Sequence, residues 1–316
     1  MSKITNLNTL MAFVAVARDG SVSRAAETLH ITQPAVSHQL KRLSEETGLT
    51  LFDRTSSGLK LTQDGAQLLS RAEQVLSALS DFQRSAQRRA GRISGKLRIG
   101  TIIDPEFIRL GQFLVRLVET YPDLQIELLH GMSGEVLERI QRKQLDVGFY
   151  LSGPQSEGNP EHPDEKEFHV SSLARFRYCV VAPPGWDSAI KQLDWPELSR
   201  LPWIGTHSQS VHHRLIEREL QPLKASLNIV ALVDQEASML EMVRSGIGLS
   251  LCRESIALRE QQAHGLIVSE KVHVPCDMSF ITPKNRRNDP AIKAVFELLE
   301  ELWSHQPYSL EQNTSP

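Results

Sequence analysis

A short polar run near the start of the chain carries side chains that could read the edges of nucleic-acid bases. Gln33, Pro34, Ser37, His38 and Lys41 are spaced so that they share one face of a helix. A glutamine amide can donate and accept together at an adenine edge, a serine can bond either base edge, and a proline ring can touch a thymine methyl group. A lysine can neutralise a phosphate. The same face could instead be an ordinary solvated helix surface, so its surroundings must decide.

The elements that would hold this face are three short helices. Apolar residues recur at helical spacing over residues 7–17, and Asp19-Gly20 breaks the pattern. Ser21 suits the N-cap of a second helix over residues 22–29, and His30-Ile31 forms a turn. Thr32 suits the N-cap of the third helix and Pro34 its first turn. The inward stripe of this third helix is formed by Val36, Leu40 and Leu43.

The charge of the chain is divided unevenly. The 316 residues have a net charge of −3, and 40% of them are apolar. Residues 1–98 contain 14 Lys and Arg and 8 Asp and Glu, a net charge of +6, while residues 99–316 contain 21 and 30, a net charge of −9. This asymmetry suits a phosphate-facing module joined to an acidic partner domain. The length also predicts two or more domains.

The first part of the chain resembles the LysR-type transcriptional regulators. The resemblance is carried, in this order, by Phe13, Ser21, Ala25-Ala26, Leu29, Gln33-Pro34-Ala35-Val36-Ser37, Leu43, Gly48, Leu51-Phe52, Arg54, Leu61-Thr62 and Gly65. It implies a winged helix-turn-helix DNA-binding domain over residues 1–61, with the QPAVS helix as recognition helix and residues 54–61 as wing. The chain departs from the family at Ser44, where Glu is usual, and around residues 56–58, where a second wing Arg is common.

The predicted DNA contacts combine that helix face, its caps and the wing. A double-stranded operator is the expected partner, and Arg54 is expected to reach the minor groove or the backbone. The predicted residues are Ser21, Thr32, Gln33, Pro34, Ser37, His38, Lys41 and Arg54.

A heptad pattern follows the wing and predicts a linker and dimerisation helix within residues 62–91, capped by Thr62. Apolar or small residues alternate at spacings of four and three: Leu61, Gly65, Leu68, Ala72, Val75, Leu79, Phe82 and Ala86. We expect Leu68, Val75, Leu79 and Phe82 to face a second copy of the chain. The alternative is that this helix packs back onto the winged domain. The family resemblance implies a homodimer, frequently extended to a homotetramer.

From residue 92 onward, strands and helices alternate, which predicts an α/β fold. Two chain crossings predict two lobes around a cleft, as in periplasmic binding proteins: lobe I over about 96–168 and 271–304, and lobe II over about 169–270. Strands are expected at 97–100, 125–129, 147–151, 178–182, 203, 229–233, 249–252 and 278–282, and helices at 108–121, 134–142, 210–220, 236–245 and 290–304. The sensor half of LysR-type regulators has this architecture, and Leu97–Gly100, Leu145–Gly148 and Val243–Gly248 carry the resemblance.

A small-molecule effector is expected where strands end, because ligands of open α/β sheets bind beyond the carboxyl ends of the strands. Family members commonly place Ser or Thr in the loop where this chain has Ile102, Ile103 and Asp104, which disfavours a carboxylate effector and favours an uncharged, partly apolar or amine-bearing one. Alternatively, the isoleucines fill the core and Asp104 caps the next helix. The predicted effector residues are Thr101, Ile102, Ile103, Asp104, Gly131, Ser133, Phe149, Gly205, Thr206 and His207.

Other chemistry finds less support in the sequence. His207, His212, His213 and Glu217 could suggest a metal, but we interpret them as surface residues and expect neither metal nor cofactor. Motifs of the GxSxG, HExxH, P-loop and GxGxxG types do not occur, so an enzyme is not expected. An enzyme with an added DNA domain and a ligand-independent architectural DNA binder are the alternatives.

The remaining expectations concern cysteines and location. Cys179, Cys252 and Cys276 are widely spaced, which predicts buried thiols, although a redox role for Cys252 with Cys276 stays open. A signal peptide and a membrane-spanning segment are not recognisable. We therefore expect a cytoplasmic protein that acts at the nucleoid, with RNA polymerase as a further partner.

Overall fold

The computed structural model describes residues 6–55, 58–87, 93–102, 104–154 and 163–304. The chain divides into two compact units, one up to Gly95 with the short segment Arg142–Gln144, and one formed by Lys96–Gln141 and the chain from Leu145 onward. Each unit is described by itself.

The first unit begins with three helices, α1 (Leu7–Asp19), α2 (Val22–Thr28) and α3 (Gln33–Thr47). The Asn6 side chain caps α1, and Gly20 ends it with a φ of 64°. The Thr32 hydroxyl accepts a hydrogen bond from Ala35 N at 3.4 Å, so the predicted cap of α3 is confirmed. Ser21 stands at the N-cap position of α2, but its side chain makes no capping hydrogen bond. The predicted N-cap position of Ser21 is therefore confirmed, but the hydrogen bond expected from its side chain is absent from the structure of this described helix.

Small residues let these helices approach closely. Ala12, Ala25 and Ala26 share one buried cluster with Val16 and Val36. A second cluster joins Phe13, Leu43, Leu51 and Ala72, and the rings of Phe13 and Phe52 meet edge to face with centroids 5.6 Å apart. The two clusters fix α3 by its inner face and leave its outer face to solvent.

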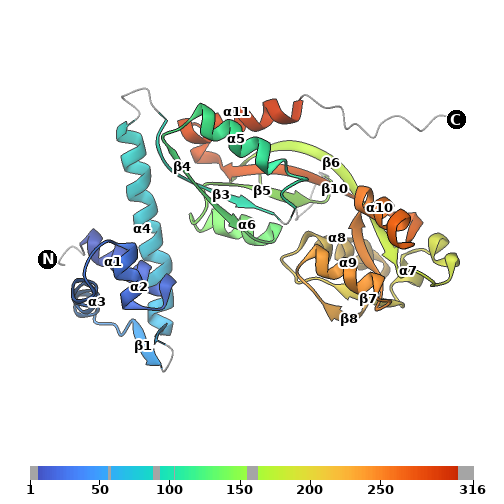
Figure 1. Ribbon diagram of the computed structural model, residues 1–316, viewed down its shortest axis with the longest axis horizontal. Helices are drawn as coiled ribbons and strands as arrows, with labels where there is room; N and C mark the ends of the chain where they lie inside the picture. Colours follow the sequence, from blue (N-terminus) through green and yellow to red (C-terminus); the bar gives the residue numbers. More distant parts are fainter. Residues whose placement is uncertain (1–5, 56–57, 88–92, 103, 155–162, 305–316) are drawn as a thin grey trace. The chain divides into compact units, whose positions relative to one another are not determined.

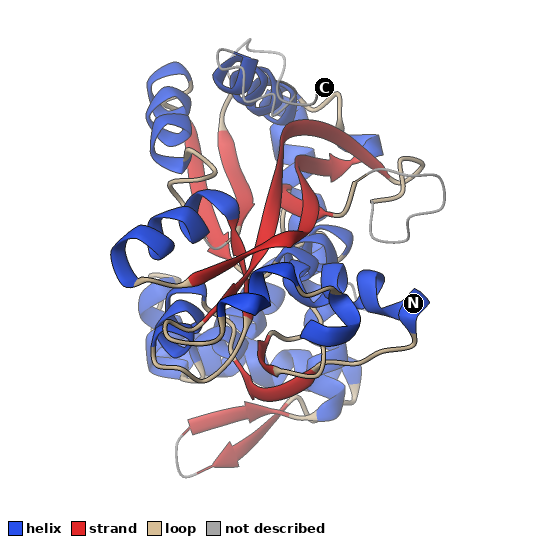
Figure 2. Ribbon diagram, turned by 90° about the vertical axis from the view of Figure 1, so that its right-hand side faces the viewer, coloured by secondary structure: helices blue, strands red, loops and turns tan. Residues whose placement is uncertain are grey.

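The predicted wing is an antiparallel hairpin of β1 (Phe52–Thr55) and β2 (Gly58–Leu61). Leu59 N donates to Gly20 O at 3.2 Å, which ties the hairpin to the end of α1. Gly58 has a φ of 131°, and a Cβ there would lie 2.7 Å from Gly20 O, so a larger residue would break this contact. In Figure 2 the hairpin is the pair of strands at the lower edge of the view, with its tip drawn in grey.

The long helix α4 (Gln63–Gln87) follows the wing (Figure 1). The Thr62 hydroxyl accepts from Gly65 N at 2.9 Å, as expected of its cap. The heptad seam divides into two parts. Leu68 is partly buried against the core cluster of Phe13 and Leu51, in line with the alternative of packing onto the winged domain, and its place in the dimer seam stays a prediction. Val75 is 47% exposed and Phe82 is 69% exposed.

The main sheet of the second unit has the strand order β4-β3-β5-β10-β6-β9. β3 and β5 are parallel, whereas β10 runs antiparallel to β5 and β6, and β6 antiparallel to β9. A separate parallel pair is formed by β7 and β8. The strands are β3 (Gly95–Thr101), β4 (Leu124–His130), β5 (Val147–Ser152), β6 (Phe168–Ala182), β7 (Pro202–Gly205), β8 (Asn228–Leu232), β9 (Ser250–Arg253) and β10 (Ile267–Pro283).

The helices of this unit largely follow the expected segments. α11 has the predicted bounds, while α10 and the short helix α7 were not anticipated from the sequence. The helices are α5 (Leu110–Thr120), α6 (Ser133–Gln141), α7 (Trp195–Leu198), α8 (Val211–Leu220), α9 (Glu236–Arg244), α10 (Glu254–His264) and α11 (Pro290–Ser304), with single 3₁₀ turns at Ser188–Gln192, Gln221–Leu223 and Lys284–Arg286.

Two long strands pass through both lobes. β6 pairs with β10 from Phe168↔Pro283 to Ala182↔Ile267, with register irregularities between Val268 and His273 and between Met278 and Ser279. Figure 1 shows both strands extending from the lobe that carries α5 and α11 to the lobe that carries α8, α9 and α10. The sequence indicated only the segments 178–182 and 278–282 of these strands, so their length is a correction.

Each lobe has its own core. In lobe I the rings of Phe113, Phe149 and Phe280 meet edge to face, with Phe149 and Phe280 centroids 5.0 Å apart. In lobe II a cluster of buried residues includes Ile204, Val243 and Cys252. The separate cores allow the lobes to remain rigid while the segments between them change.

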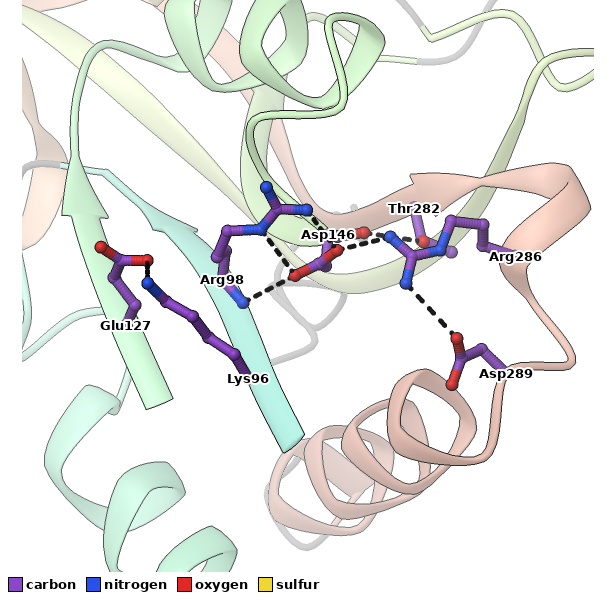
Figure 3. A network of polar contacts seen from close by, with 7 residues as sticks. All are labelled: Lys96, Arg98, Glu127, Asp146, Thr282, Arg286 and Asp289. Carbon is purple, nitrogen blue, oxygen red and sulfur yellow. Dashed lines mark hydrogen bonds and ion pairs between the residues drawn. The ribbon is translucent and has the colours of Figure 1, made fainter. Parts of the chain in front are cut away.

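A buried carboxylate ties three strands of lobe I together (Figure 3). Asp146, just before β5, accepts from Arg98 N at 2.8 Å and Arg98 Nη2 at 2.9 Å, and from Arg286 in the 3₁₀ turn after β10. Burial by itself would raise the pKa of Asp146, but the hydrogen bonds and charges of Arg98 and Arg286 lower it to about 2. Thr282 Oγ1 also donates to Asp146 O at 3.0 Å. This network stabilises lobe I where β3, β5 and β10 lie side by side.

Candidate functional site

The outer face of α3 carries the predicted base-reading residues. Gln33, Pro34, Ser37, His38 and Lys41 are all exposed, while Val36 on the opposite face is fully buried. Thr32 and Pro34 stand at the start of the helix, where free N–H groups favour an anionic partner. Lys41 Nζ lies 3.8 Å from Glu45 Oε1, and both side chains are exposed, so the pair is weak enough for Lys41 to turn to a phosphate.

The other predicted DNA contacts, Ser21 and Arg54, lie outside the exposed face of α3. Ser21 lies half-buried between α1 and α2. Arg54 belongs to β1, where its backbone pairs with Leu59, and its side chain lies outside the described residues. Arg24, which the sequence analysis did not select, is an exposed cation of α2 that donates to Asp19 O. Its position in the helix before the recognition helix would have been a reason to include it.

A cavity of about 80 Å³ lies between the two lobes of the second unit. We call it the interlobe cavity. Lobe I supplies its wall after β3 and at the start of α6, and lobe II supplies the starts of α8 and α9 and the end of β9. The lining residues are Ile102, Asp104, Phe107, Gly131, Met132, Ser133, Leu151, Tyr178, Thr206, Ser210, Val211, His212, Asp234, Gln235, Glu236, Met239 and Arg253.

Half of the predicted effector residues line this cavity: Ile102, Asp104, Gly131, Ser133 and Thr206. Ile103 lies outside the described residues. The sequence analysis missed the residues that α8, α9 and β9 contribute, because their approach to lobe I depends on the tertiary fold.

The remaining predicted residues do not line the cavity, and these expectations are corrected. Thr101 is fully buried, with its hydroxyl 2.6 Å from His130 Nδ1. Phe149 points into the core of lobe I, since successive strand residues face opposite sides of a sheet. At Gly205 an added Cβ would meet the Ile229 side chain at 3.2 Å, inside lobe II. His207 is exposed and outside the lining.

The interlobe cavity is acidic. Asp104, Asp234 and Glu236 supply carboxylates, and among the described lining residues Arg253 is the one cation. Burial lowers the pKa of His212 to about 4, so its imidazole is neutral at pH 7. Burial also raises the pKa of Tyr178 well above its ordinary value, which keeps the phenol protonated.

Asp104 and Arg253 connect the two lobes. Arg253 Nη2 donates to Asp104 Oδ2, and it lies 3.9 Å from Glu236 Oε2. Asp104 Oδ1 accepts from Phe107 N at 2.9 Å in the turn before α5, but the N-cap of α5 is Arg109, so the alternative that Asp104 caps the next helix is wrong. The backbone of Asp104 has a φ of 135°, a conformation that costs energy for a residue other than glycine and that is common where structure serves function. The guanidinium of Arg253 also lies over the Phe107 ring, 4.2 Å from its centroid.

Two buried polar atoms of the lining lack a hydrogen-bond partner within the part of the chain that the structure describes. Glu236 Oε1 and Thr206 Oγ1 are buried and without a hydrogen-bond partner among the described residues. Burial raises the pKa of Glu236 above its ordinary value, against the opposing charge of Arg259. Buried polar atoms are nearly always hydrogen-bonded, so these two atoms point to a ligand with polar groups.

Direct hydrogen bonds hold the lobes against each other. Arg214 Nη2 of α8 donates to Leu151 O at 2.8 Å, and Gly134 N of α6 donates to Gln209 O at 3.0 Å. A Cβ at Gly134 would lie 2.2 Å from Gln209 Oε1, so a glycine allows this approach. Ser133 Oγ exchanges hydrogen bonds with the N and O atoms of Leu151. The lobes are thus closed along one side of the cavity.

The other candidates from the sequence have plain structural settings. His213 Nε2 lies 3.6 Å from Glu217 Oε2, and the described residues contain no His, Cys, Asp or Glu group arranged to hold a metal.

Cys252 lies opposite Cys179 on neighbouring strands, whereas Cys276 lies opposite Phe176, so the register does not pair Cys252 with Cys276. Burial raises the pKa of Cys179 to about 11. Over the described residues, no helix is long and apolar enough to span a bilayer.

A winged helix-turn-helix with an exposed polar recognition helix, joined to a two-lobed α/β unit with a cavity between its lobes, defines a ligand-binding transcription regulator. The family comparisons agree with both halves. Residues 7–66 match the bacterial regulatory helix-turn-helix of the lysR family, and residues 90–304 match the LysR substrate binding domain. The chain belongs to the LysR family of DNA-binding transcriptional regulators.

Individual relatives and solved structures extend this comparison. The chain is 37% identical over 261 residues to the HTH-type transcriptional regulator YofA of Bacillus velezensis, covering 83% of this chain and 85% of that protein. It is 29% identical over 301 residues to the uncharacterized HTH-type transcriptional regulator YfeR of Shigella flexneri, covering 94% of each. Among solved structures it resembles full-length CbnR in complex with its target DNA, with a TM-score of 0.61 at 20% identity and coverage of 94% of this chain and 99% of that chain.

Proposed function

We propose that this regulator changes its affinity for operator DNA, or the bend it imposes on that DNA, when a small molecule occupies the interlobe cavity. The observation that carries the proposal is the pairing of Asp104 from lobe I with Arg253 from lobe II in the wall of that cavity. A ligand that binds differently to the closed and opened lobes shifts the balance between them. By linkage, DNA that prefers one of these states changes the affinity for the ligand by the same factor.

For the DNA side, we propose that the outer face of α3 enters the major groove. Gln33, Pro34, Ser37 and His38 would meet base edges, while Lys41 and Arg54 would meet phosphate or the minor groove. Thr32 and Ser21 would contact the backbone near the helix starts. The exposure of this α3 face and the burial of Val36 and Leu43 on the opposite face support this assignment.

For the effector, we propose a small molecule that carries an amine and an apolar part. The lining combines the carboxylates of Asp234 and Glu236 with apolar side chains such as Ile102, Met132 and Met239. Arg253 is already paired with Asp104, so it offers little to a carboxylate ligand. An ammonium group beside Glu236 Oε1 would supply the donor that this buried atom lacks. Ile102, Asp104, Gly131, Ser133 and Thr206 remain our candidates for contacts with it.

The size of the cavity favours a compact molecule. A water molecule needs roughly 10–15 Å³ of such space, so about 80 Å³ holds on the order of six non-hydrogen atoms before the lobes move. Opening of the lobes would admit a somewhat larger ligand.

For assembly, we propose a homodimer through Val75, Leu79 and Phe82 on α4, with further pairing to a tetramer. The exposure of Val75 and Phe82 on a helix with heptad spacing supports the first contact. The unpaired edge of β8, where Ile229, Val230 and Leu232 are 46%, 50% and 56% exposed, supports a second contact. We propose that the assembled protein works in the cytoplasm at the nucleoid, recruits RNA polymerase and performs no catalytic reaction.

The test is a thermal-shift screen on the full chain with small primary amines, each matched by its carboxylate and its neutral amide. Amines should raise the melting temperature, because only a ligand that prefers the folded state stabilises it. Glu236→Gln should remove the response, whereas Glu119→Gln, an equal charge change on exposed α5, should keep it. A response to carboxylates alone, or an undiminished response in Glu236→Gln, would contradict the proposed effector class.

A further inference from the structure

A second cavity lies beside the point where the chain crosses between the lobes. Its volume is about 490 Å³, several times that of the interlobe cavity. We call it the hinge cavity. The residues that line it come from the segment before α5, the middle of β6, the start of α10 and the end of α11: Glu106, Phe107, Arg109, Ala174, Arg175, Phe176, Arg177, Arg253, Glu254, Ser255, Leu258 and Trp303.

The walls of the hinge cavity are aromatic and apolar. The rings of Phe107 and Phe176 meet edge to face, with centroids 4.8 Å apart. Leu258 of α10 also lines the cavity, and its side chain is 49% exposed, so it is accessible to a ligand. Trp303 adds the largest ring of the lining. Such walls suit a flat, hydrophobic ligand.

The polar groups of the same cavity are mainly guanidinium donors. Four arginines line the cavity, together with the carboxylates of Glu106 and Glu254. Two of these arginines, Arg175 and Arg253, are paired with Asp277 and Asp104, which lie outside the lining. Arg177 Nη2 donates to Glu254, but Arg177 Nε is buried with no partner among the described residues. Trp303 Nε1 is also buried and has no hydrogen-bond partner within the described part of the chain. Both of these atoms are donors, so the missing group is an acceptor.

We propose that the hinge cavity is a second ligand site, which takes a small aromatic carboxylate. The aromatic part would lie against Phe107, Phe176 and Leu258, and the carboxylate would accept hydrogen bonds from Arg177 and Trp303. Arg177 Nη2 is paired with Glu254, as Arg253 is with Asp104, but Arg177 keeps a buried donor, Nε, with no partner among the described residues, and this N–H can bond to one carboxylate oxygen. This assignment is opposite in charge to the amine proposed for the interlobe cavity, and it does not depend on that proposal.

The two cavities are built on common residues. Phe107 and Arg253 line both of them. Phe176 of the hinge cavity also contacts the ring of Tyr178, which lines the interlobe cavity, with centroids 5.2 Å apart. A ligand in the hinge cavity would therefore press on the same side chains that join the lobes, at the strands about which the lobes would move.

The experiment is calorimetric titration of the full-length protein with 2-naphthoate, 2-naphthamide and 2-naphthylamine up to millimolar concentration. Naphthoate should bind with one site per chain and should quench tryptophan fluorescence. The neutral amide should bind more weakly by on the order of tenfold, because the amide lacks the charge that the guanidinium recognises. If the amide or the amine binds as tightly as the acid, the proposed ligand class is wrong.

Variants locate the site. Arg177→Gln should weaken naphthoate binding by on the order of tenfold or more, and Leu258→Trp should abolish binding by filling the cavity from an exposed position of α10 that tolerates a larger side chain. Arg116→Gln, which removes a cation of α5 outside the lining, and Glu236→Gln, in the interlobe cavity, should bind naphthoate like the unchanged protein. If Glu236→Gln loses naphthoate binding while Leu258→Trp keeps it, the ligand lies in the interlobe cavity and the proposal is wrong. The proposal is also wrong if the unchanged protein does not bind naphthoate.

Discussion

Asp104 and Arg253 belong to opposite lobes of the second unit and pair in the wall between the interlobe cavity and the hinge cavity. The Arg253 side chain is 9% exposed and the Asp104 side chain 25% exposed, so water screens the pair little. Burial and the charge of Arg259 lower the pKa of Arg253 to about 10, and the guanidinium remains charged at neutral pH. The pair is thus a charged connection whose loss would be felt by both lobes.

We predict that Asp104→Asn lowers the free energy of unfolding of the second unit by about 1–3 kcal/mol, because the buried guanidinium of Arg253 loses its charged partner. Urea denaturation followed by circular dichroism measures this change. Glu297→Gln, which breaks the exposed pair with Lys293 on α11, is the control and should change the stability by less than about 0.5 kcal/mol. Equal effects of the two variants would mean that the Asp104 pair is no stronger than a surface pair.

On the recognition helix α3, we expect different residues to contact base edges and to contact phosphates. Gln33→Ala should cost about 1–3 kcal/mol on the true operator and little on scrambled DNA, because a paired amide contact distinguishes one base edge. Titrations of both duplexes at several salt concentrations measure the difference. If Gln33→Ala weakens both duplexes alike and changes the salt dependence, this residue contacts phosphate.

Lys41→Ala should weaken binding to operator and scrambled DNA equally. It should also reduce the slope of log affinity against log salt by about 0.9 for each phosphate contact that is lost. Lys293→Ala on α11, a cation outside the winged domain, should leave the slope unchanged. An unchanged slope in Lys41→Ala would show that this side chain does not reach the backbone.

Two leucines of the heptad seam should behave differently. Leu79→Asp should dissociate the oligomer, since it would bury a carboxylate against its symmetry mate, and operator affinity should fall with it. Leu68→Ala should instead lower the stability of the winged domain by about 2–4 kcal/mol, because Leu68 packs against the cluster of Phe13 and Leu51. Light scattering and thermal denaturation distinguish these outcomes. An intact oligomer in Leu79→Asp would move the interface away from α4.

Asp146 gives the second unit a defined dependence on acid. The pKa of the Asp146 carboxyl is about 2 in the folded chain and near its ordinary value of 3.8 in the unfolded chain. Because the folded pKa is the lower one, its contribution of about 2 kcal/mol is complete above the unfolded pKa and disappears as the pH falls from 4 toward 2. The stability difference between the unchanged protein and Asp146→Asn should therefore narrow over this range. A constant difference would show that Arg98 and Arg286 do not hold the ionised form.

Local patterns predicted the elements well where the apolar period is strong. The bounds of α11 follow from a clear amphipathic stripe between Pro290 and Ser304. α10 was missed, because its buried residues Ile256, Ala257 and Glu260 form no apolar repeat. The lengths of β6 and β10 were underestimated for a related reason. β10 alternates buried and exposed residues between Val272 and Cys276, and β6 is only partly buried around Arg175, so neither section forms the continuous apolar run of a core strand.

The candidate effector site was predicted in part, through the rule that ligands lie beyond strand ends. That rule selects Asp104 and Ser133 correctly as lining residues, but it also selects Phe149, whose side chain faces the core. Arg253 and Glu236 could not be found from local sequence. They reach the interlobe cavity because lobe II folds against lobe I, and nothing in the residues around them indicates this approach.

The pairing of β6 with β10 limits how the lobes can move. Two separate connections would allow the lobes to slide, tilt and rotate independently. Hydrogen bonds join the two strands from Phe168↔Pro283 to Ala182↔Ile267, so sliding one lobe past the other would break the register along this ribbon. Two-stranded ribbons twist readily, and twisting keeps their hydrogen bonds. We therefore expect the two lobes of the sensor to move relative to each other mainly by twisting of this ribbon.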